Sequence, residues 1–254
     1  MMSYVHSTLS HNKEFLDHYV DGISIPYDDF LEEHILSSEI FSIFFMGEQI
    51  GFFGKLGNMV TIFFIKDEYF YRANEVFTDI KMRFNIQEAF VPTTDLGFLS
   101  VALEKFASFE IQALHFTETD AVVRPPEFPR DRLRLAIEND LQAVEQLAGD
   151  FLDRYEERIV NQEIYLLEED HETIGLGVLV ENKIMRNCIG TGMFTRESKR
   201  GEGIGRSIII HLKAIAHELG KTPVPGCWYY NMSSKKTLES AGYISKSKLL
   251  KFHF

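Results

Sequence analysis

The sequence predicts an α/β (α+β) protein built of two domains in tandem. At 254 residues, 45% of them hydrophobic, the chain is long enough for one large domain or two of ordinary size. Its first 125 residues carry 8 Lys and Arg against 19 Asp and Glu, whereas the remainder carries 18 against 19. Seventeen of the 22 phenylalanines also precede residue 126. This asymmetry indicates two domains with separate cores.

A proline-rich stretch lies between the halves. "TETDAVVRPPEFPRD", residues 117–131, holds three prolines in five positions, which cannot continue a helix or a central strand and which stiffen a connector. We therefore expect a first domain over residues 1–116, a linker over 117–130 and a second domain over 131–254.

Composition disfavours several classes of protein. The chain shows no bilayer-spanning apolar run and no signal-peptide pattern at its N-terminus, so we expect a cytoplasmic protein with no membrane partner. Its two cysteines, Cys188 and Cys227, form no CxxC, and HExxH is absent, so we expect no disulfide framework and no metal site. A net charge of −12 argues against a nucleic-acid partner.

The elements of the second half follow from its periodicity. "RLRLAIEND" predicts a strand, and "LQAVEQLAGDFLDRY" predicts a helix capped by Asp140. Three β-rich runs with polar breaks, "EIYLLEED", "TIGLGVLVEN" and "KIMRNCIGTGMFT", predict an antiparallel meander. From Ile204 to Leu219 apolar residues recur at helical spacing, and Gly220 provides a C-terminal cap. "GCWYY" then predicts a strand, "SSKKTLESAG" a helix and "YISKSKLLKFHF" a closing strand or hairpin.

A glycine-rich loop joins the meander to the long helix. In "ESKRGEGIGRSI" three glycines stand between two arginines: Arg200, Gly201, Gly203, Gly205 and Arg206. Glycine lets the backbone approach a ligand with no Cβ in the way, and the first N–H groups of a helix lack intrahelical partners. Together with the helix dipole and the nearby cations, these features predict a cradle for an anion, most naturally a pyrophosphate.

The loop matches neither the P-loop pattern nor GxGxxG, and what remains is R-x-x-G-x-G. Arg200, Gly203 and Gly205, following a strand, resemble the acyl-CoA pyrophosphate loop of the GNAT superfamily of N-acyltransferases. "LAIENDLQAVEQL" resembles the opening strand and helix of that family, and "NMSSKKTLESAGY" resembles the helix after its fifth strand, which ends in Gly-aromatic. The resemblance covers about residues 130–254 and implies a mixed, mostly antiparallel twisted sheet flanked by helices.

The resemblance also implies acetyl-CoA as cofactor and a set of residues that bind it. The pyrophosphate would lie on the backbone of the loop, beside Arg200, at Gly201, Glu202, Gly203, Ile204, Gly205 and Arg206. The pantetheine arm would pair with the strand edge at Met193, Phe194 and Thr195, and the thiol end would lie near Asn231 and Ser234. The last two also suit helix capping, because they stand three residues apart at a helix start.

Acyl transfer to nitrogen requires a base for the amine, a donor for the oxyanion and a proton or hydrogen bond for the thiolate. The tyrosine that serves the thiolate in many members of the family falls at Leu238 here. The alternatives for that role are Ser234, Asn231 with a bound water, Tyr229 and Tyr230. Glu172, Glu181 or a water chain would supply the base.

The first half repeats part of the second. "MGEQIGFFG" aligns with "DHETIGLGV" at a shift of 124 residues, which matches Glu48, Ile50 and Gly51 to Glu172, Ile174 and Gly175. No glycine occurs between Gly57 and Gly97, where the phosphate loop would fall. We therefore expect residues 1–116 to form a degenerate GNAT-like domain that lacks this loop.

Two functions of different class fit the sequence. One is an acetyl-CoA-dependent N-acetyltransferase that transfers an acetyl group directly to a primary amine of a small molecule or to an amino terminus. The other is a non-catalytic CoA-binding sensor or partner-binding module, which the missing tyrosine and the degenerate half support. The intact loop favours the enzyme, as a monomer or homodimer, and leaves the acceptor and the acyl chain length open.

Overall fold

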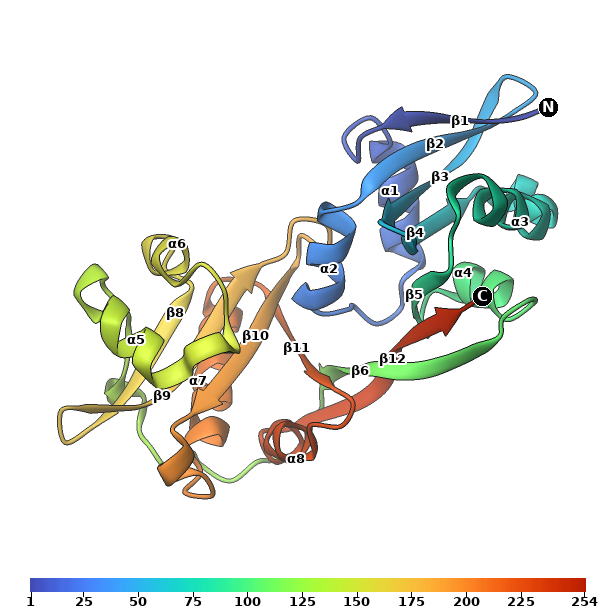
Figure 1. The fold of residues 1–254 in the computed structure, drawn as a ribbon. Coiled ribbons are helices and arrows are strands. Elements are labelled where there is room, and N and C mark those ends of the chain that lie inside the picture. Colours follow the sequence, from blue (N-terminus) through green and yellow to red (C-terminus); the bar gives the residue numbers. More distant parts are fainter. The chain divides into compact units, whose positions relative to one another are not determined.

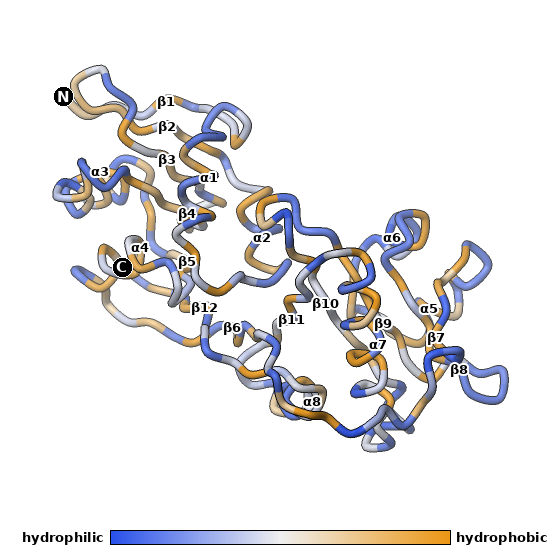
Figure 2. The backbone as a smooth tube through the Cα atoms, turned by 180° about the vertical axis from the view of Figure 1, so that it is seen from behind, coloured by the Kyte–Doolittle hydropathy of each residue, from blue (hydrophilic) through white to orange (hydrophobic).

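The computed structural model describes residues 1–254 and divides them into two units. Unit 1 comprises residues 1–115 and 247–254, and unit 2 comprises residues 116–246. Each unit is a mixed β-sheet flanked by helices (Figure 1). In Figure 2 the strands carry much of the hydrophobic colour, while many connecting loops are hydrophilic.

Unit 1 contains the elements of the first half of the chain together with most of the last strand. They are β1 (Met2–Ser7), α1 (Lys13–Gly22), α2 (Asp29–Leu36), β2 (Glu39–Phe45), β3 (Glu48–Leu56), β4 (Met59–Ile65), the 3₁₀ helix η1 (Asp67–Arg72), α3 (Ala73–Phe84), β5 (Glu88–Pro92), α4 (Leu96–Ala102), β6 (Ser108–Glu118) and β12 (Tyr243–His253).

The sheet of unit 1 has the order β1-β2-β3-β4-β5-β12-β6, with β4 and β5 parallel. Helices α3 and α4 cover one face, where Phe77 and Phe98 pack against Phe63. Alternate residues point to the opposite face, where Phe64 of β4 meets Phe15 of α1. Much of the phenylalanine excess of the first half therefore fills the core of unit 1.

The final strand does not follow the sequence-based boundary. We expected residues 131–254 to form one domain, but residues 247–254 belong to unit 1. There β12 pairs antiparallel with β5, from Leu249 opposite Pro92 to His253 opposite Glu88. Leu249 and Phe252 are fully buried, so the apolar residues of this strand complete the core of unit 1.

Unit 2 repeats the same order of elements. They are the 3₁₀ helix η2 (Arg130–Arg132), β7 (Leu133–Leu135), η3 (Glu138–Asp140), α5 (Leu141–Ala148), η4 (Gly149–Phe151), α6 (Tyr155–Val160), β8 (Ile164–Glu169), β9 (Glu172–Glu181), β10 (Cys188–Thr195), η5 (Glu197–Lys199), α7 (Ile204–Glu218), β11 (Thr222–Trp228) and α8 (Met232–Ser240).

The sheet of unit 2 has the order β11-β10-β9-β8-β7. The antiparallel meander of β8, β9 and β10 is confirmed, and β10 pairs parallel with β11. Helix α7 covers one face, and α5 and α6 cover the other. Gly175 in β9 allows α7 to approach, since a Cβ there would lie 2.7 Å from the Ile204 side chain. At its far end α7 stops as predicted, with Gly220 at a φ of +70°.

Two local expectations were wrong. The predicted helix from Leu141 to Tyr155 is interrupted at Gly149, whose φ is +52°, and continues as the separate helix α6. Strand β11 was predicted over "GCWYY", but it runs from Thr222 to Trp228 and so includes two prolines. Pro223 and Pro225 stand two residues apart, so their backbone nitrogens face the same side of the strand. The two missing N–H donors are therefore both on that side.

The repeat predicted from "MGEQIGFFG" and "DHETIGLGV" corresponds to equivalent places in the two sheets. β3 begins at Glu48 and β9 at Glu172, and the aligned Ile50 and Ile174 are both buried. Gly51 pairs with the last residue of β4, and Gly175 pairs with the last residue of β10.

None of the helices in the structure is both long and apolar enough to cross a membrane.

Candidate functional site

A cavity of about 670 Å³ opens in unit 2 where β10 and β11 diverge. Their parallel pairing runs from Cys188 opposite Thr222 to Thr191 opposite Pro225 and then stops. β10 continues to Thr195, so Gly192–Thr195 keep an edge that no residue of β11 pairs. We call this cavity, lined by β10, the loop after it and the start of α8, the unit 2 groove.

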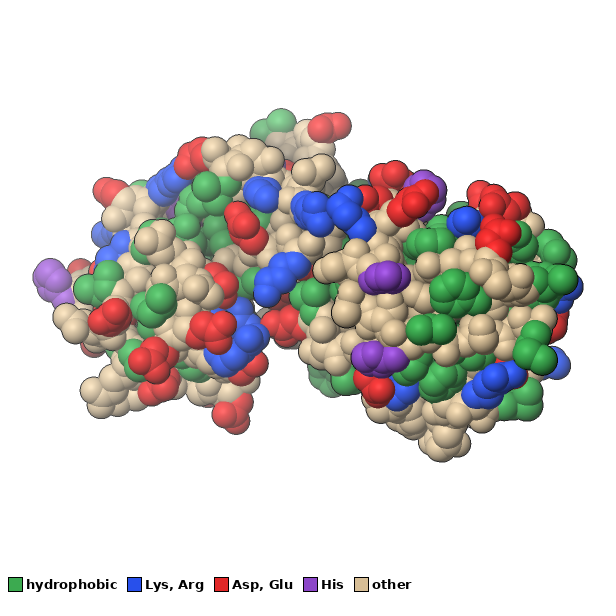
Figure 3. Space-filling view, turned by 90° about the horizontal axis from the view of Figure 1, so that it is seen from above, with side chains coloured by type: hydrophobic (Ala, Val, Ile, Leu, Met, Phe, Trp, Pro, Cys, Tyr) green, Lys and Arg blue, Asp and Glu red, His purple; other side chains and the backbone are tan.

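The charged residues that line the unit 2 groove all have the same sign. They are Arg124, Arg200, Arg206 and Lys236. Elsewhere charges of both signs are mixed, as the face drawn in Figure 3 shows. Arg124 and Arg206 both pair with Glu127, at 2.6 and 3.0 Å, so Arg200 and Lys236 supply most of the positive charge of the groove.

The glycine loop presents backbone donors to this groove. Helix α7 starts at Ile204, after Gly201 and Gly203 at φ values of +91° and +84°. Ser207 N–H makes an intrahelical bond to the Gly203 carbonyl at 2.9 Å, so the N–H groups of Ile204, Gly205 and Arg206 precede the helical ladder. These donors and the positive end of the helix dipole suit an anion.

The structure gives Gly203 a different role from the one expected. A Cβ there would lie 2.5 Å from Cδ of Glu127, whose side chain packs over the loop. Burial raises the pKa of the Glu127 carboxyl, but its own backbone N–H and the guanidinium groups of Arg206 and Arg124 outweigh burial and lower it. Gly203 is thus required by its φ and by Glu127, whereas the expectation was that it leaves room for phosphate.

Arg206 was expected to bind the cofactor, but its side chain is engaged within the fold. The guanidinium is buried, donates to the carbonyls of Arg124, Pro125 and Ser240, and pairs with Glu127 at 3.0 Å. Only the backbone N–H of Arg206 remains for a ligand. The segment predicted as a linker therefore packs on the start of α7.

The other predicted cofactor residues fall mostly on the groove. Met193, Phe194 and Thr195 line it from β10, and Arg200, Gly201, Gly203, Ile204 and Gly205 line it from the loop. A Cβ on Gly205 would lie 3.2 Å from Thr195 Oγ1, so this glycine keeps α7 close to the strand. Glu202 is outside the lining and pairs with Lys199 at 3.5 Å.

The predicted catalytic residues divide into two sets. Asn231 and Ser234 both line the groove, and Asn231 Oδ1 accepts the Ser234 N–H at 3.0 Å as the N-cap of α8. Tyr230 is 62% exposed and lies against Trp228, outside the lining. Glu172 is also outside it and pairs with Arg196 at 3.3 Å. The structure therefore brings Asn231 and Ser234 to the groove but not Tyr230 or Glu172.

Sequence reasoning missed Thr191, which stands where β10 and β11 separate. Its side chain is 6% exposed and lines the groove, and its hydroxyl has no hydrogen-bond partner. A buried hydroxyl without a partner is costly, so it is a donor available to a ligand. Arg124 and Lys236 were also missed, and no motif marks any of the three.

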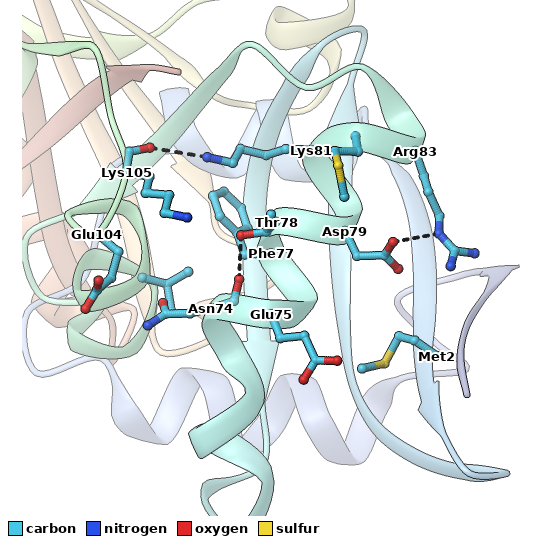
Figure 4. Close-up of a pocket in the computed structure, with 12 residues that line it drawn as sticks. Met2, Asn74, Glu75, Phe77, Thr78, Asp79, Lys81, Arg83, Glu104 and Lys105 are labelled. Atoms are coloured by element: carbon cyan, nitrogen blue, oxygen red, sulfur yellow. Dashed lines mark hydrogen bonds and ion pairs between the residues drawn. The ribbon is translucent and has the colours of Figure 1, made fainter.

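A different cavity, of about 520 Å³, lies beside α3 in unit 1 (Figure 4). Two of its cations are already engaged, one with a neighbouring carboxylate and the other with the backbone. Arg83 Nε donates to Asp79 at 2.9 Å, and Lys81 Nζ donates to the Lys105 carbonyl at 3.2 Å. We assign no chemistry to this cavity.

In the comparison with protein families, a model described as an acetyltransferase (GNAT) domain matches residues 8–119. These residues form most of unit 1, whereas the glycine loop lies in unit 2. No curated protein matches the chain.

Solved structures show the same fold along the whole chain. An acetyltransferase of the GNAT family from Colwellia psychrerythraea superposes with a TM-score of 0.89 at 18% identity, covering 100% of this chain and 99% of that one. A GCN5-related N-acetyltransferase from Sphaerobacter thermophilus gives a TM-score of 0.63 at 11% identity, over 99% and 95% of the two chains. A tandem GNAT protein from the clavulanic acid biosynthesis pathway gives 0.60 at 10%, over 99% and 98%. The chain therefore has the α/β fold of GNAT acetyltransferases, and residues 8–119 match an acetyltransferase domain of that family.

Proposed function

We propose that unit 2 binds acetyl-CoA in its groove and transfers the acetyl group directly to a primary amine of a small molecule or to an amino terminus. The observation that carries this proposal is the coincidence, in one cavity, of an unpaired strand edge, the N–H groups of a helix start and charged residues that are all cations. A long ligand with phosphates at one end matches these three features in order along the groove.

The proposed binding contacts use the residues that line the groove. The pyrophosphate would accept hydrogen bonds from the N–H groups of residues 201–206, beside the guanidinium of Arg200. The amides of the pantetheine arm would pair with β10 at Met193, Phe194 and Thr195. The thioester would then lie near Thr191, Asn231 and Ser234.

The chemistry needs an unprotonated amine and a stabilised thiolate. The Thr191 hydroxyl is the buried donor without a partner at the inner end of the unpaired edge, and we assign it the hydrogen bond to the departing sulfur. Leu238, at the family's tyrosine position, is buried and lines the groove without a polar group. The residues of the groove supply no carboxylate or histidine, so the amine would lose its proton to water.

We further propose that the chain is a tandem of two GNAT-like copies. The supporting observations are the shared order of elements and the matching positions of Gly51 and Gly175 in the two sheets. In unit 1 the segment between β4 and α3 is the 3₁₀ helix η1, which contains no glycine. Unit 1 would then be the copy without a phosphate loop.

One observation favours a second function. Because neither a general base nor the family tyrosine lines the groove, unit 2 would also suit a sensor that binds CoA without turnover.

Two measurements together distinguish the transferase from the sensor. One is a thiol-release assay with acetyl-CoA over a panel of primary amines and peptide amino termini, and the other is calorimetric titration with CoA. Release that depends on an amine supports the transferase, and binding with no release on any acceptor class supports the sensor. Absence of CoA binding overturns both.

A further inference from the structure

A cavity of about 630 Å³ lies in unit 1 between α1, the end of β4 and the start of α4. Its place in the order of elements corresponds to that of the unit 2 groove. Each cavity is lined by the first strand of a parallel pair, β4 or β10, and by the helix that follows the second strand of that pair, α4 or α8. We call it the unit 1 pocket. Its carboxylates are Glu14, Asp21, Asp67, Glu68 and Asp95, and its lining includes one lysine, Lys66, and one histidine, His18.

Asp95 is the buried member of this set. Its side chain is the N-cap of α4, where Oδ1 accepts the Phe98 N–H at 2.9 Å. The residue is only 7% exposed, and its second oxygen, Oδ2, is buried without a hydrogen-bond partner. Tyr19 lines the same pocket and is 4% exposed, and its hydroxyl interacts with Tyr27. A buried carboxylate oxygen is normally satisfied, so Asp95 Oδ2 points to a ligand that donates a hydrogen bond.

The charge of the pocket selects the sign of that ligand. The single lysine is held at the rim, where Lys66 Nζ lies 3.9 Å from Glu48 and 4.0 Å from Glu68 and sits 5.3 Å from the centre of the Phe15 ring. The carboxylates outnumber it by five to one, so the potential in the pocket is negative and attracts a cation.

The walls select an organic cation. Phe63, Phe70 and Phe98 line the pocket together with Ile23 and Leu96, so apolar side chains share its surface with the carboxylates. Aromatic faces attract ammonium groups, and methylene chains gain from burial against such walls. A bare metal ion would gain nothing from this apolar surface.

We propose that the unit 1 pocket binds an aliphatic amine with two or more ammonium groups, one on Asp95 Oδ2 and another on the rim carboxylates. Burial raises the pKa of Asp95 to about 7, although the Phe98 N–H lowers it, and a bound ammonium would favour the charged carboxylate. This site does not depend on acetyl transfer by unit 2.

The test is calorimetric titration of the full chain with spermidine, 1,4-diaminobutane and n-butylamine. We expect one site for spermidine and for the diamine, and at least about tenfold weaker binding of the monoamine, which loses one charge-assisted hydrogen bond. Equal affinity for the three amines, or several equivalent sites, would overturn the proposal.

Asp95→Asn removes the charge but keeps an oxygen that can cap α4, so we expect about tenfold or more loss of diamine affinity. The matched control is Asp28→Asn, since Asp28 is also a buried N-cap in unit 1 but lies outside the pocket. Glu68→Gln at the rim provides a milder second variant that leaves the caps intact. Affinity that survives both Asp95→Asn and Glu68→Gln refutes the site.

The readout also separates this proposal from the one for unit 2. Gly203→Val, which alters the phosphate loop, should leave diamine binding unchanged even where acetyl-CoA binding is lost. Loss of diamine affinity in Gly203→Val would contradict an independent site in unit 1.

Discussion

The unit 1 pocket and the unit 2 groove occupy corresponding places in two sheets of the same element order, yet their charges are opposite. In unit 2 the segment between strand and helix carries glycines at positive φ, and the charged lining residues are cations. In unit 1 the equivalent segment is η1, which begins with Asp67 and Glu68. Each cavity lies at the same place in the order of elements, and a few loop and rim residues set the sign of the charge that lines it.

The helices that follow the parallel strands give the sharpest comparison. Each begins with a side chain that caps the third N–H: Asp95 on Phe98 in unit 1 and Asn231 on Ser234 in unit 2. Aspartate and asparagine cap equally well, so capping does not require the carboxylate. What differs is burial, since Asp95 is 7% exposed, whereas Asn231 is exposed at the groove.

The largest expected effect is therefore on stability, in Asp95→Asn. Burial raises the pKa of Asp95 from 3.8 to about 7. Between these values the folded chain holds a proton that the unfolded chain has lost, so the parent loses stability as the pH rises from about 4 to about 7. The variant does not titrate there, and its gain over the parent should grow across this window to at most about 4 kcal/mol.

Urea unfolding of parent and variant at pH 4.0, 5.5 and 7.5 would measure this gain. Glu14 and Asp21 of α1 and Lys66, Asp67 and Glu68 beyond β4 also face the pocket, as does His18, but they are common to both proteins. Asn231→Asp, the reverse exchange at an exposed cap, should show no such window. A difference between parent and Asp95→Asn that is independent of pH would show that Asp95 is charged in the folded chain throughout.

The next effect concerns acetyl-CoA binding to unit 2. Gly203→Val forces a β-branched residue to a φ of +84° and drives its side chain into Glu127, so the loop backbone or the Glu127 side chain must shift. We expect the Kd for acetyl-CoA to rise about tenfold or more, about 1.4 kcal/mol, in calorimetric titration. Gly220→Val is the matched control, because Gly220 has a φ of +70° at the other end of the same helix and lies outside the groove. Equal losses in both variants would attribute the effect to strain in α7.

The sequence predicted α7, the glycine loop and the meander because each depends on local spacing that one stretch of chain reveals. It did not predict that the last strand completes unit 1, because the partners of this strand lie far away in the sequence. Lys248 N–H, for example, donates to Thr93 Oγ1 across 155 residues. The side chain of Arg206 was misassigned for a similar reason. Its partners Arg124 and Pro125 lie in the segment that was expected to be a connector.

Thr191 tests the chemistry of the groove. Thr191→Val keeps the shape of the side chain but removes the hydroxyl that has no partner within the protein. We expect kcat to fall about tenfold while the Kd for acetyl-CoA changes little, because the hydroxyl would act mainly on the departing thiolate. Thr191→Ser should restore much of the rate. A kcat unaffected by the valine, with amine-dependent turnover intact, would assign Thr191 to packing alone.

The smallest effect we expect separates two adjacent lysines on α8. Lys236 lines the unit 2 groove, whereas Lys235 lies outside it and 3.9 Å from Glu239. Lys236→Gln should weaken acetyl-CoA binding about threefold at low salt, because an exposed charge contributes little, and the difference should shrink as ionic strength rises. Lys235→Gln, with the same change in net charge, should leave the Kd within error. If both variants weakened acetyl-CoA binding equally, the total positive charge of the helix would attract the ligand. The position of each cation along the groove would then not explain the difference between unit 2 and unit 1.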